Sequence, residues 1–118
     1  MSSDQRLKKN IEPLAAGLDK VMRLRPVTYR LKDAPANGGL GSQKEIGLIA
    51  QEVEKVLPEL VHTGSNGYKA VSYDKLVSML IEAVKEQQKE IREQDAALEK
   101  LEKEFSEIEE WLTALAVP

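Results

Sequence analysis

Residues 74–116 read DKLVSMLIEAVKEQQKEIREQDAALEKLEKEFSEIEEWLTALA and contain neither Pro nor Gly. Apolar residues recur along this stretch in alternating steps of three and four, a repeat that keeps one stripe of a helix facing a partner. With Val84 as position a of a heptad, the a and d positions form a seam of Val84, Gln87, Ile91, Gln94, Leu98, Leu101, Phe105, Ile108, Leu112 and Leu115. The pattern predicts one long helix over residues 74–118 that packs against other chains as a coiled coil.

The residues of this seam also indicate how many chains assemble. Large apolar residues at both a and d favour more than two strands, while Gln87 and Gln94 place polar layers that can set the register. In a parallel bundle Glu90 would face Asp95 of the next chain, so the flanking charges repel and do not explain the assembly. The alternative is a single solvated helix, which the length of the seam and the nearby Trp111 disfavour.

Shorter elements fill the first 73 residues, where Pro and Gly interrupt the apolar pattern. Val27, Tyr29 and Leu31 alternate with polar residues, which is typical of a strand with one buried face. The patterns predict helices near 14–23 and over 49–57, strands over 26–32 and 45–48, a loop over 33–43 and a hairpin over 60–73. The fold class is therefore α+β, with a small mixed head over residues 1–73 that continues directly into the long helix.

The composition excludes several kinds of chemistry. The 118 residues include one His and no Cys, which removes disulfides, thiolate zinc sites, cysteine nucleophiles and metal sites with several His ligands. The formal net charge of −3 disfavours a nucleic-acid partner, and no apolar run is long enough to span a bilayer. We therefore expect no metal, no cofactor, no nucleic acid and no membrane partner.

One pair of side chains near the N-terminus can carry chemistry. Ser3 lies five residues before Lys8, and a neutral lysine can activate a serine without a histidine. Five residues rotate a helix by about 140°, so Ser3 must lie on non-helical backbone at the start of a helix for the two side chains to meet. The alternative is structural: Ser3 or Asp4 caps a helix, and an Asp4–Lys8 ion pair keeps the lysine charged. Spacing by itself favours this structural role.

Four segments occur here in the order and approximate spacing of one known family. They are SDQRLKKNIEPL (3–14), LRPVTYRLK (24–32), IGLIAQEVEKVLPELV (46–61) and VSYDKLVSMLIEAVKE (71–86). On these motifs the chain resembles the C-terminal intramolecular chaperone, or self-cleaving peptidase, domain of phage tail spikes and tail fibres, of which the endosialidase tail spike carries the best-known member. The resemblance covers roughly residues 3–100.

The resemblance implies a function in fibre assembly. Such a domain follows a fibrous, usually triple-stranded β region, forms a homotrimer, assists the folding of that upstream segment of the same precursor, and then cuts itself off. It would act in the cytoplasm of the host cell during assembly and be absent from the mature fibre. The alternative is a trimerisation cap that sets the register of a fibre without cleavage.

The resemblance also implies roles for single residues. Ser3 is the expected nucleophile of a single-turnover serine autoprotease, Lys8 its general base, and the bond between Ser2 and Ser3 the scissile bond. Asp4, Arg6 and Asn10 match the motif and are expected to support the local geometry. Because the chain begins Met1-Ser2-Ser3, we expect it to represent the released product. We further expect correct fibre folding to desolvate Lys8 and so to control cleavage.

Overall fold

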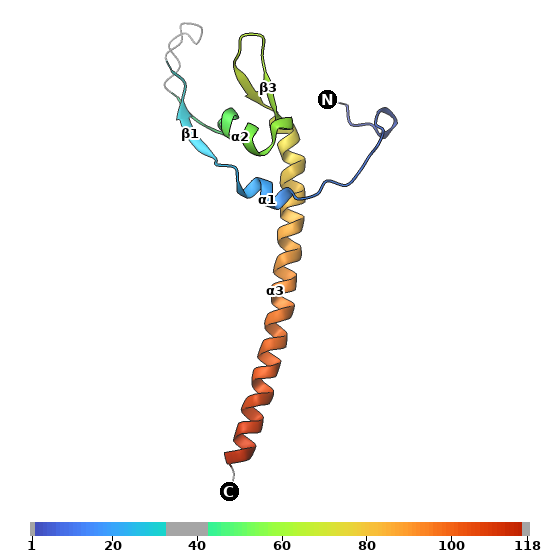
Figure 1. The fold of residues 1–118 in the computed structure, drawn as a ribbon, viewed down its shortest axis with the longest axis vertical. Coiled ribbons are helices and arrows are strands. Elements are labelled where there is room, and N and C mark those ends of the chain that lie inside the picture. Colours follow the sequence, from blue (N-terminus) through green and yellow to red (C-terminus); the bar gives the residue numbers. More distant parts are fainter. Residues whose placement is uncertain (1, 33–42, 117–118) are drawn as a thin grey trace. The chain divides into compact units, whose positions relative to one another are not determined.

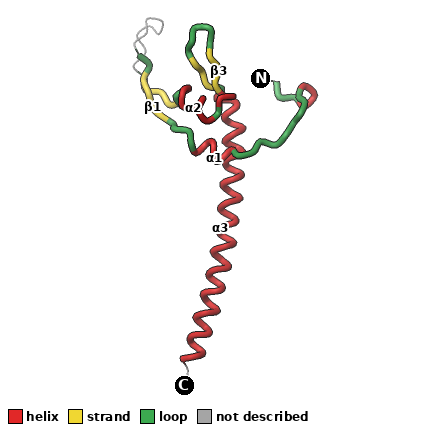
Figure 2. Tube along the Cα trace, viewed as in Figure 1, coloured by secondary structure: helices red, strands yellow, loops and turns green. Residues whose placement is uncertain are grey.

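The computed structural model describes residues 2–32 and 43–116, and it confirms an α+β fold with a long C-terminal helix (Figures 1 and 2). The elements in chain order are η1 (Gln5–Leu7), α1 (Gly17–Met22), β1 (Val27–Arg30), β2 (Lys44–Gly47), α2 (Ala50–Val56), η3 (Pro58–Leu60), β3 (Val61–Thr63), β4 (Lys69–Val71) and α3 (Tyr73–Ala116). The loop predicted over 33–43 lies outside the described residues, except for residue 43.

The chain forms two compact units, residues 1–83 and residues 84–118, and α3 runs from the first into the second. The first unit therefore includes the opening turns of α3 as well as the strands and short helices. The predicted domain limits, 1–73 and 74–118, stay a prediction.

The core of the first unit lies where α2, η3 and the start of α3 meet. Val53 and Leu57 are four residues apart, so they share one face of the α2 turn, and both are almost completely buried. Leu60 from η3 and Met79 from α3 complete the buried cluster. Pro58 at the first position of η3 ends α2 because proline cannot donate the next helical hydrogen bond. A small core is thus built from residues in and next to the helical elements α2, η3 and α3.

Two antiparallel strand pairs flank this core. Strand β3 pairs with β4, which confirms the predicted hairpin, and the Lys69 amine bonds the Glu54 carboxylate of α2 at 2.8 Å. Strand β1 pairs with β2 from Val27 opposite Gly47 to Arg30 opposite Lys44. The sequence did not predict that pairing, because it joins strands separated by a long connection.

The prediction that the strand over residues 26–32 has one buried face is wrong for the single chain. The strand is shorter, Val27–Arg30, and only Val27 is partly covered, while Tyr29 and the following Leu31 are exposed. In the described chain β1 belongs to a two-stranded sheet, so only β2 pairs with it. Alternation therefore located the strand correctly but not its burial.

The first helix also begins later than its apolar spacing predicts. Ala16 adopts φ 58°, ψ 33°, a left-handed conformation that cannot continue a right-handed helix, so α1 starts at Gly17. Gly17 is buried, and a Cβ there would lie 3.1 Å from the side chain of Glu82 and from the Met79 carbonyl oxygen. The close approach of α1 to α3 therefore requires a residue without a side chain at position 17.

Candidate active site

The N-terminal segment folds around a short 3-10 turn, η1, that Asp4 caps. Asp4 has extended backbone angles, and its carboxylate accepts a hydrogen bond from the Arg6 backbone N–H at 2.9 Å. An Asp at this position satisfies a backbone donor that the turn itself leaves unpaired. Lys8 ends the turn with extended angles of φ −114° and ψ 145°. Ser3 and Lys8 thus lie on non-helical backbone on either side of one tight turn.

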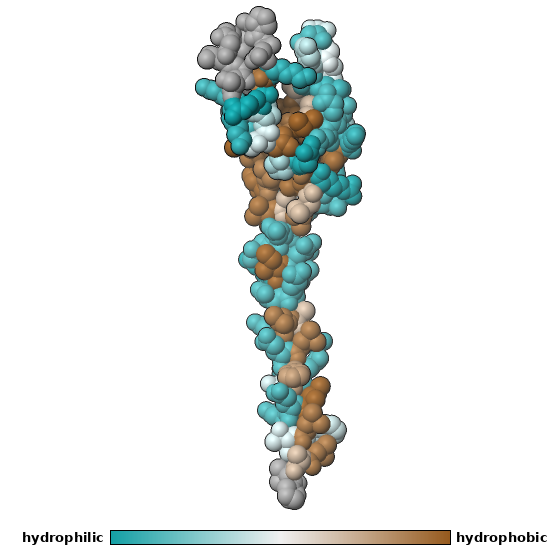
Figure 3. All heavy atoms as spheres, turned by 90° about the vertical axis from the view of Figure 1, so that its left-hand side faces the viewer, coloured by the Kyte–Doolittle hydropathy of each residue, from teal (hydrophilic) through white to brown (hydrophobic). Residues whose placement is uncertain are grey.

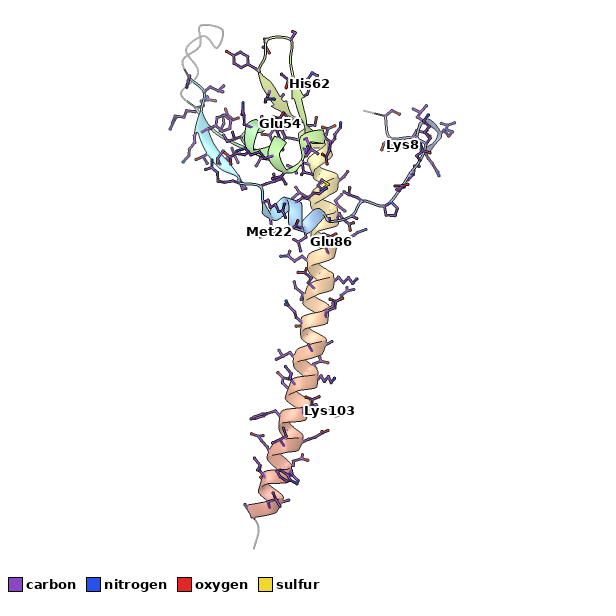
Figure 4. All side chains as sticks on the ribbon, in the orientation of Figure 1. Lys8, Met22, Glu54, His62, Glu86 and Lys103 are labelled. Carbon is purple, nitrogen blue, oxygen red and sulfur yellow. The ribbon has the colours of Figure 1, made fainter. Side chains whose placement is uncertain are left out.

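This turn brings the two predicted reactive side chains together. The Lys8 Nζ donates a hydrogen bond to the Ser3 Oγ at 2.7 Å. The geometric condition for a pair five residues apart, a serine on non-helical backbone before a helical turn, is met. Figure 4 labels Lys8 on this segment. The catalytic roles of the two residues stay a prediction, since the distance alone does not establish a reaction.

Asp4 contacts Arg6 and not the lysine. The Arg6 Nε bonds one carboxylate oxygen at 3.1 Å and its Nη2 bonds the other at 2.8 Å. These hydrogen bonds from the guanidinium lower the pKa of the Asp4 carboxyl below its ordinary value, and Asp4 raises the pKa of Arg6 in return. The alternative hypothesis of a purely structural role predicted that Ser3 or Asp4 is a cap, and Asp4 does cap the turn. The same hypothesis predicted an Asp4–Lys8 ion pair, which is not formed.

The remaining predicted residues of this segment have simpler surroundings. Asn10 adopts a positive φ of 54°, a conformation that Asn tolerates better than most residues, so it turns the chain just after the pair. Ser2 precedes Ser3, the predicted nucleophile, on exposed, non-helical backbone, and its carbonyl belongs to the predicted scissile bond. Ser3 and Lys8 are themselves exposed in the single chain. Water therefore reaches the lysine amine in this state.

Within the described residues, the structure offers no arrangement for a metal. No group of three or more His, Cys, Asp or Glu side chains in that part of the chain could hold an ion. His62, the single histidine, is exposed on β3 (Figure 4). Among the helices of residues 2–32 and 43–116, none is both long and apolar enough to cross a membrane.

The second unit presents the predicted seam as an uncovered surface. The eight apolar seam residues are exposed, and their exposed fractions range from 43% at Ile91 to 64% at Leu115. The same register continues back into the first unit, where Val77 and Leu80 are also exposed. Figure 3 shows hydrophobic patches along α3 with hydrophilic surface between them. A helix with such a stripe has apolar surface available for other chains.

Comparison with known proteins assigns the chain to a family. Residues 3–62, which include η1 and the Ser3–Lys8 pair, match the family model described as chaperone of endosialidase, a peptidase family by its designation. The chain belongs to this family. The match confirms the family that the motifs of the sequence indicate.

Relatives of this endosialidase-chaperone chain include proteins described as long tail fiber protein Gp37. The protein of Enterobacteria phage K3 is 38% identical over 100 residues, which cover 81% of this chain and 8% of the relative. The protein of Salmonella phage S16 is 35% identical over 117 residues, covering 96% of this chain and 15% of the relative. That of Enterobacteria phage Ox2 is 36% identical over 96 residues, covering 77% and 38%. The chain thus spans well under half the length of these relatives.

The sequence of this family member did not predict the contact between Arg6 and Asp4. Residues two apart do not share a face of an α-helix, so helical spacing pairs Asp4 with Lys8 instead. The signal that could have indicated the contact is Asp4 as a cap two residues before an arginine, because a 3-10 turn is tighter than an α-helix.

Proposed function

We propose that this chaperone domain trimerises through α3, assists the folding of the fibre segment that precedes it in the same precursor, and then releases itself by cleaving the Ser2–Ser3 bond. A role as a tail fibre chaperone follows from the family and from the tail fibre relatives. The cleavage is proposed on one observation, the 2.7 Å hydrogen bond between Lys8 and Ser3. The reaction would take place in the host cell during assembly, and the mature fibre would lack the domain.

The exposed seam supports trimerisation. Apolar side chains along more than four heptads of α3 lack a cover in the single chain, and burying them is favourable in proportion to the area removed from water. Large apolar residues at both seam positions favour more than two strands. A helical clamp that holds three chains in register would also lower the entropy cost of the non-local strand pairing in a fibre.

The proposed reaction needs the hydrogen bond between Lys8 and Ser3 to reverse its direction. A neutral Lys8 amine accepts the proton of the Ser3 hydroxyl while the Ser3 Oγ attacks the carbonyl carbon of Ser2. The bond between that carbon and the Ser3 nitrogen breaks, and the nitrogen leaves as an amine that takes up a proton. The resulting ester between Ser2 and the Ser3 Oγ is hydrolysed by water, which frees the carboxylate of the upstream fibre and the hydroxyl of Ser3.

Assembly is proposed to control this reaction through Lys8. The amine is exposed in the single chain, where water stabilises its charged form. Packing of the N-terminal segment against the folded fibre or a neighbouring subunit would exclude water and favour the neutral amine that the reaction requires. Cleavage would then follow correct folding, and the released fibre would be kinetically stable because its unfolding could no longer be reversed with the help of the domain.

The test uses the domain fused behind its native upstream segment. We expect a released fragment close to the 13.2 kDa of this chain. Ser3→Ala and Lys8→Ala should each slow its release by about 10²-fold or more, while sedimentation still shows trimers. Lys9→Ala and Ser65→Ala are matched controls, because they remove the same groups at neighbouring or distant exposed positions, and they should cleave normally.

Three results would contradict the proposal in different ways. Trimers without any released fragment would leave the non-cleaving trimerisation cap as the function. Cleavage of a monomeric precursor as fast as the trimer would refute control by assembly. Normal cleavage of the Ser3→Ala variant would refute the assigned nucleophile.

A further inference from the structure

The Asp4 carboxylate shares its segment with three cations, Arg6, Lys8 and Lys9. Asp4 directly follows Ser3, whose Oγ lies 2.7 Å from the Lys8 amine, so the turn η1 brings the residue next to Asp4 into contact with this cation. The structure shows all three of its hydrogen bonds going to Arg6 instead, one from the backbone N–H and two from the guanidinium. In the described part of the chain, Ser3 is the only hydrogen-bond partner of the Lys8 amine.

We propose that Arg6 is a positioning residue for the Ser3–Lys8 pair: its guanidinium occupies the Asp4 carboxylate and so keeps this carboxylate from forming an ion pair with the Lys8 amine. The proposal rests on the proposed cleavage. It assigns Arg6 a role in the chemistry without contact to the reacting atoms.

An arginine suits this role for two physical reasons. Its planar guanidinium binds both oxygens of a carboxylate at once, and the 3.1 Å and 2.8 Å contacts have this forked arrangement. It also stays charged at every pH at which a lysine loses its proton, so Asp4 remains occupied while Lys8 changes state. A lysine at position 6 could offer only a single flexible ammonium group.

The consequence concerns the state of the Lys8 amine. A carboxylate close to an ammonium group stabilises its charged form, and a charged amine cannot accept the proton of Ser3. The charged groups on the same segment are Asp4, Arg6, Lys9 and Glu12, and no hydrogen bond or ion pair joins Lys8 to another element in residues 2–32 and 43–116. Asp4 and Glu12 are each four residues from Lys8 in the sequence, but only Asp4 is the direct neighbour of Ser3, which contacts the Lys8 amine. Asp4 is therefore the carboxylate that could hold Lys8 charged once Arg6 is removed.

The first measurement uses the chain as it is and needs no cleavage. A limiting amount of acetic anhydride modifies only neutral amines, and mass spectrometry compares Lys8 with the exposed Lys100 of α3 as an internal reference. We expect Arg6→Gln to slow the labelling of Lys8 by about fivefold, the factor for one ion pair at 4 Å in water. Lys9→Gln is the matched control, because it removes the same charge from the same segment and leaves the Asp4–Arg6 contact in place.

The double variant Asp4→Asn/Arg6→Gln gives the decisive comparison. Asn keeps the capping oxygen but removes the negative charge, so the labelling of Lys8 should return to the level of Lys9→Gln. Equal labelling in Arg6→Gln and Lys9→Gln would overturn the proposal, and so would a slow Arg6→Gln variant that Asp4→Asn does not restore. The latter result would mean that Arg6 acts through the shape of η1.

The second measurement is cleavage of the fused precursor as a function of pH. Arg6→Gln should move the pH of half-maximal cleavage upward, and the double variant should move it back. A precursor that cleaves in no variant refutes the proposed cleavage, while the labelling experiment still decides whether Arg6 diverts Asp4 from Lys8. The two proposals can therefore fail separately.

Discussion

The substitution Phe105→Ala tests whether the seam of α3 is the core of an assembly. Phe105 is 63% exposed in the single chain. A Phe side chain carries roughly 200 Å² of surface, so about 125 Å² remains to be buried between chains. At about 25 cal/mol per Å² this burial is worth about 3 kcal/mol for each chain and about 9 kcal/mol for a trimer.

The concentration dependence of assembly converts this energy into a measurable shift. For a trimer, the concentration at which half of the chains are assembled varies with the square root of the dissociation constant. A loss of about 9 kcal/mol therefore raises this concentration by about a thousandfold. Sedimentation over a dilution series measures the midpoint directly.

The matched control for Phe105→Ala is Lys103→Ala. Lys103 lies two residues earlier on the same helix, outside the seam and exposed (Figure 4). Its replacement should change stability by less than about 0.5 kcal/mol and leave the midpoint where it is. Equal midpoints for the two variants would refute the seam as an interface, because Phe105 would then be as solvated in solution as it is in the single chain.

Two further predictions concern the first unit. Leu57→Ala should lower the free energy of unfolding by about 2–5 kcal/mol, because the side chain is completely buried in a core of few residues. Urea unfolding, followed by the amide NMR signals of β3 and β4, measures this loss. A loss no larger than that of Leu31→Ala, at an exposed position, would contradict the assigned core. Arg6 lowers the pKa of Asp4. The Asp4–Arg6 contact should therefore be fully formed at any pH above the ordinary pKa of a carboxyl, and it should be lost as the pH falls through the lowered pKa of Asp4. The NMR shift of the Arg6 amide proton should titrate with a midpoint below the ordinary value, and an ordinary midpoint would disprove the effect of Arg6.

Local signals were sufficient for much of the fold. The apolar spacing over residues 49–57 predicted α2, which spans Ala50–Val56. The helical pattern from Asp74 onward predicted the start of α3 within one residue of Tyr73. The start of α1 was not predicted, because the left-handed Ala16 is a single-residue conformation that side-chain spacing does not indicate. The limited burial of β1 was not predicted either, because burial depends on the elements that cover a strand and alternation describes only the strand itself.

For the candidate site, too, some features followed from the sequence and others only from the tertiary structure. The sequence by itself determined that Ser3 lies five positions before Lys8 and that either Ser3 or Asp4 can serve as a cap. It also determined the apolar period of α3, since these are properties of spacing along one chain. Only the tertiary structure decided that a 3-10 turn brings Ser3 to 2.7 Å from Lys8 and gives Asp4 to Arg6. The physical reason is that a contact across a tight turn depends on the backbone angles of each residue within it, and helical spacing assumes angles that this segment does not adopt.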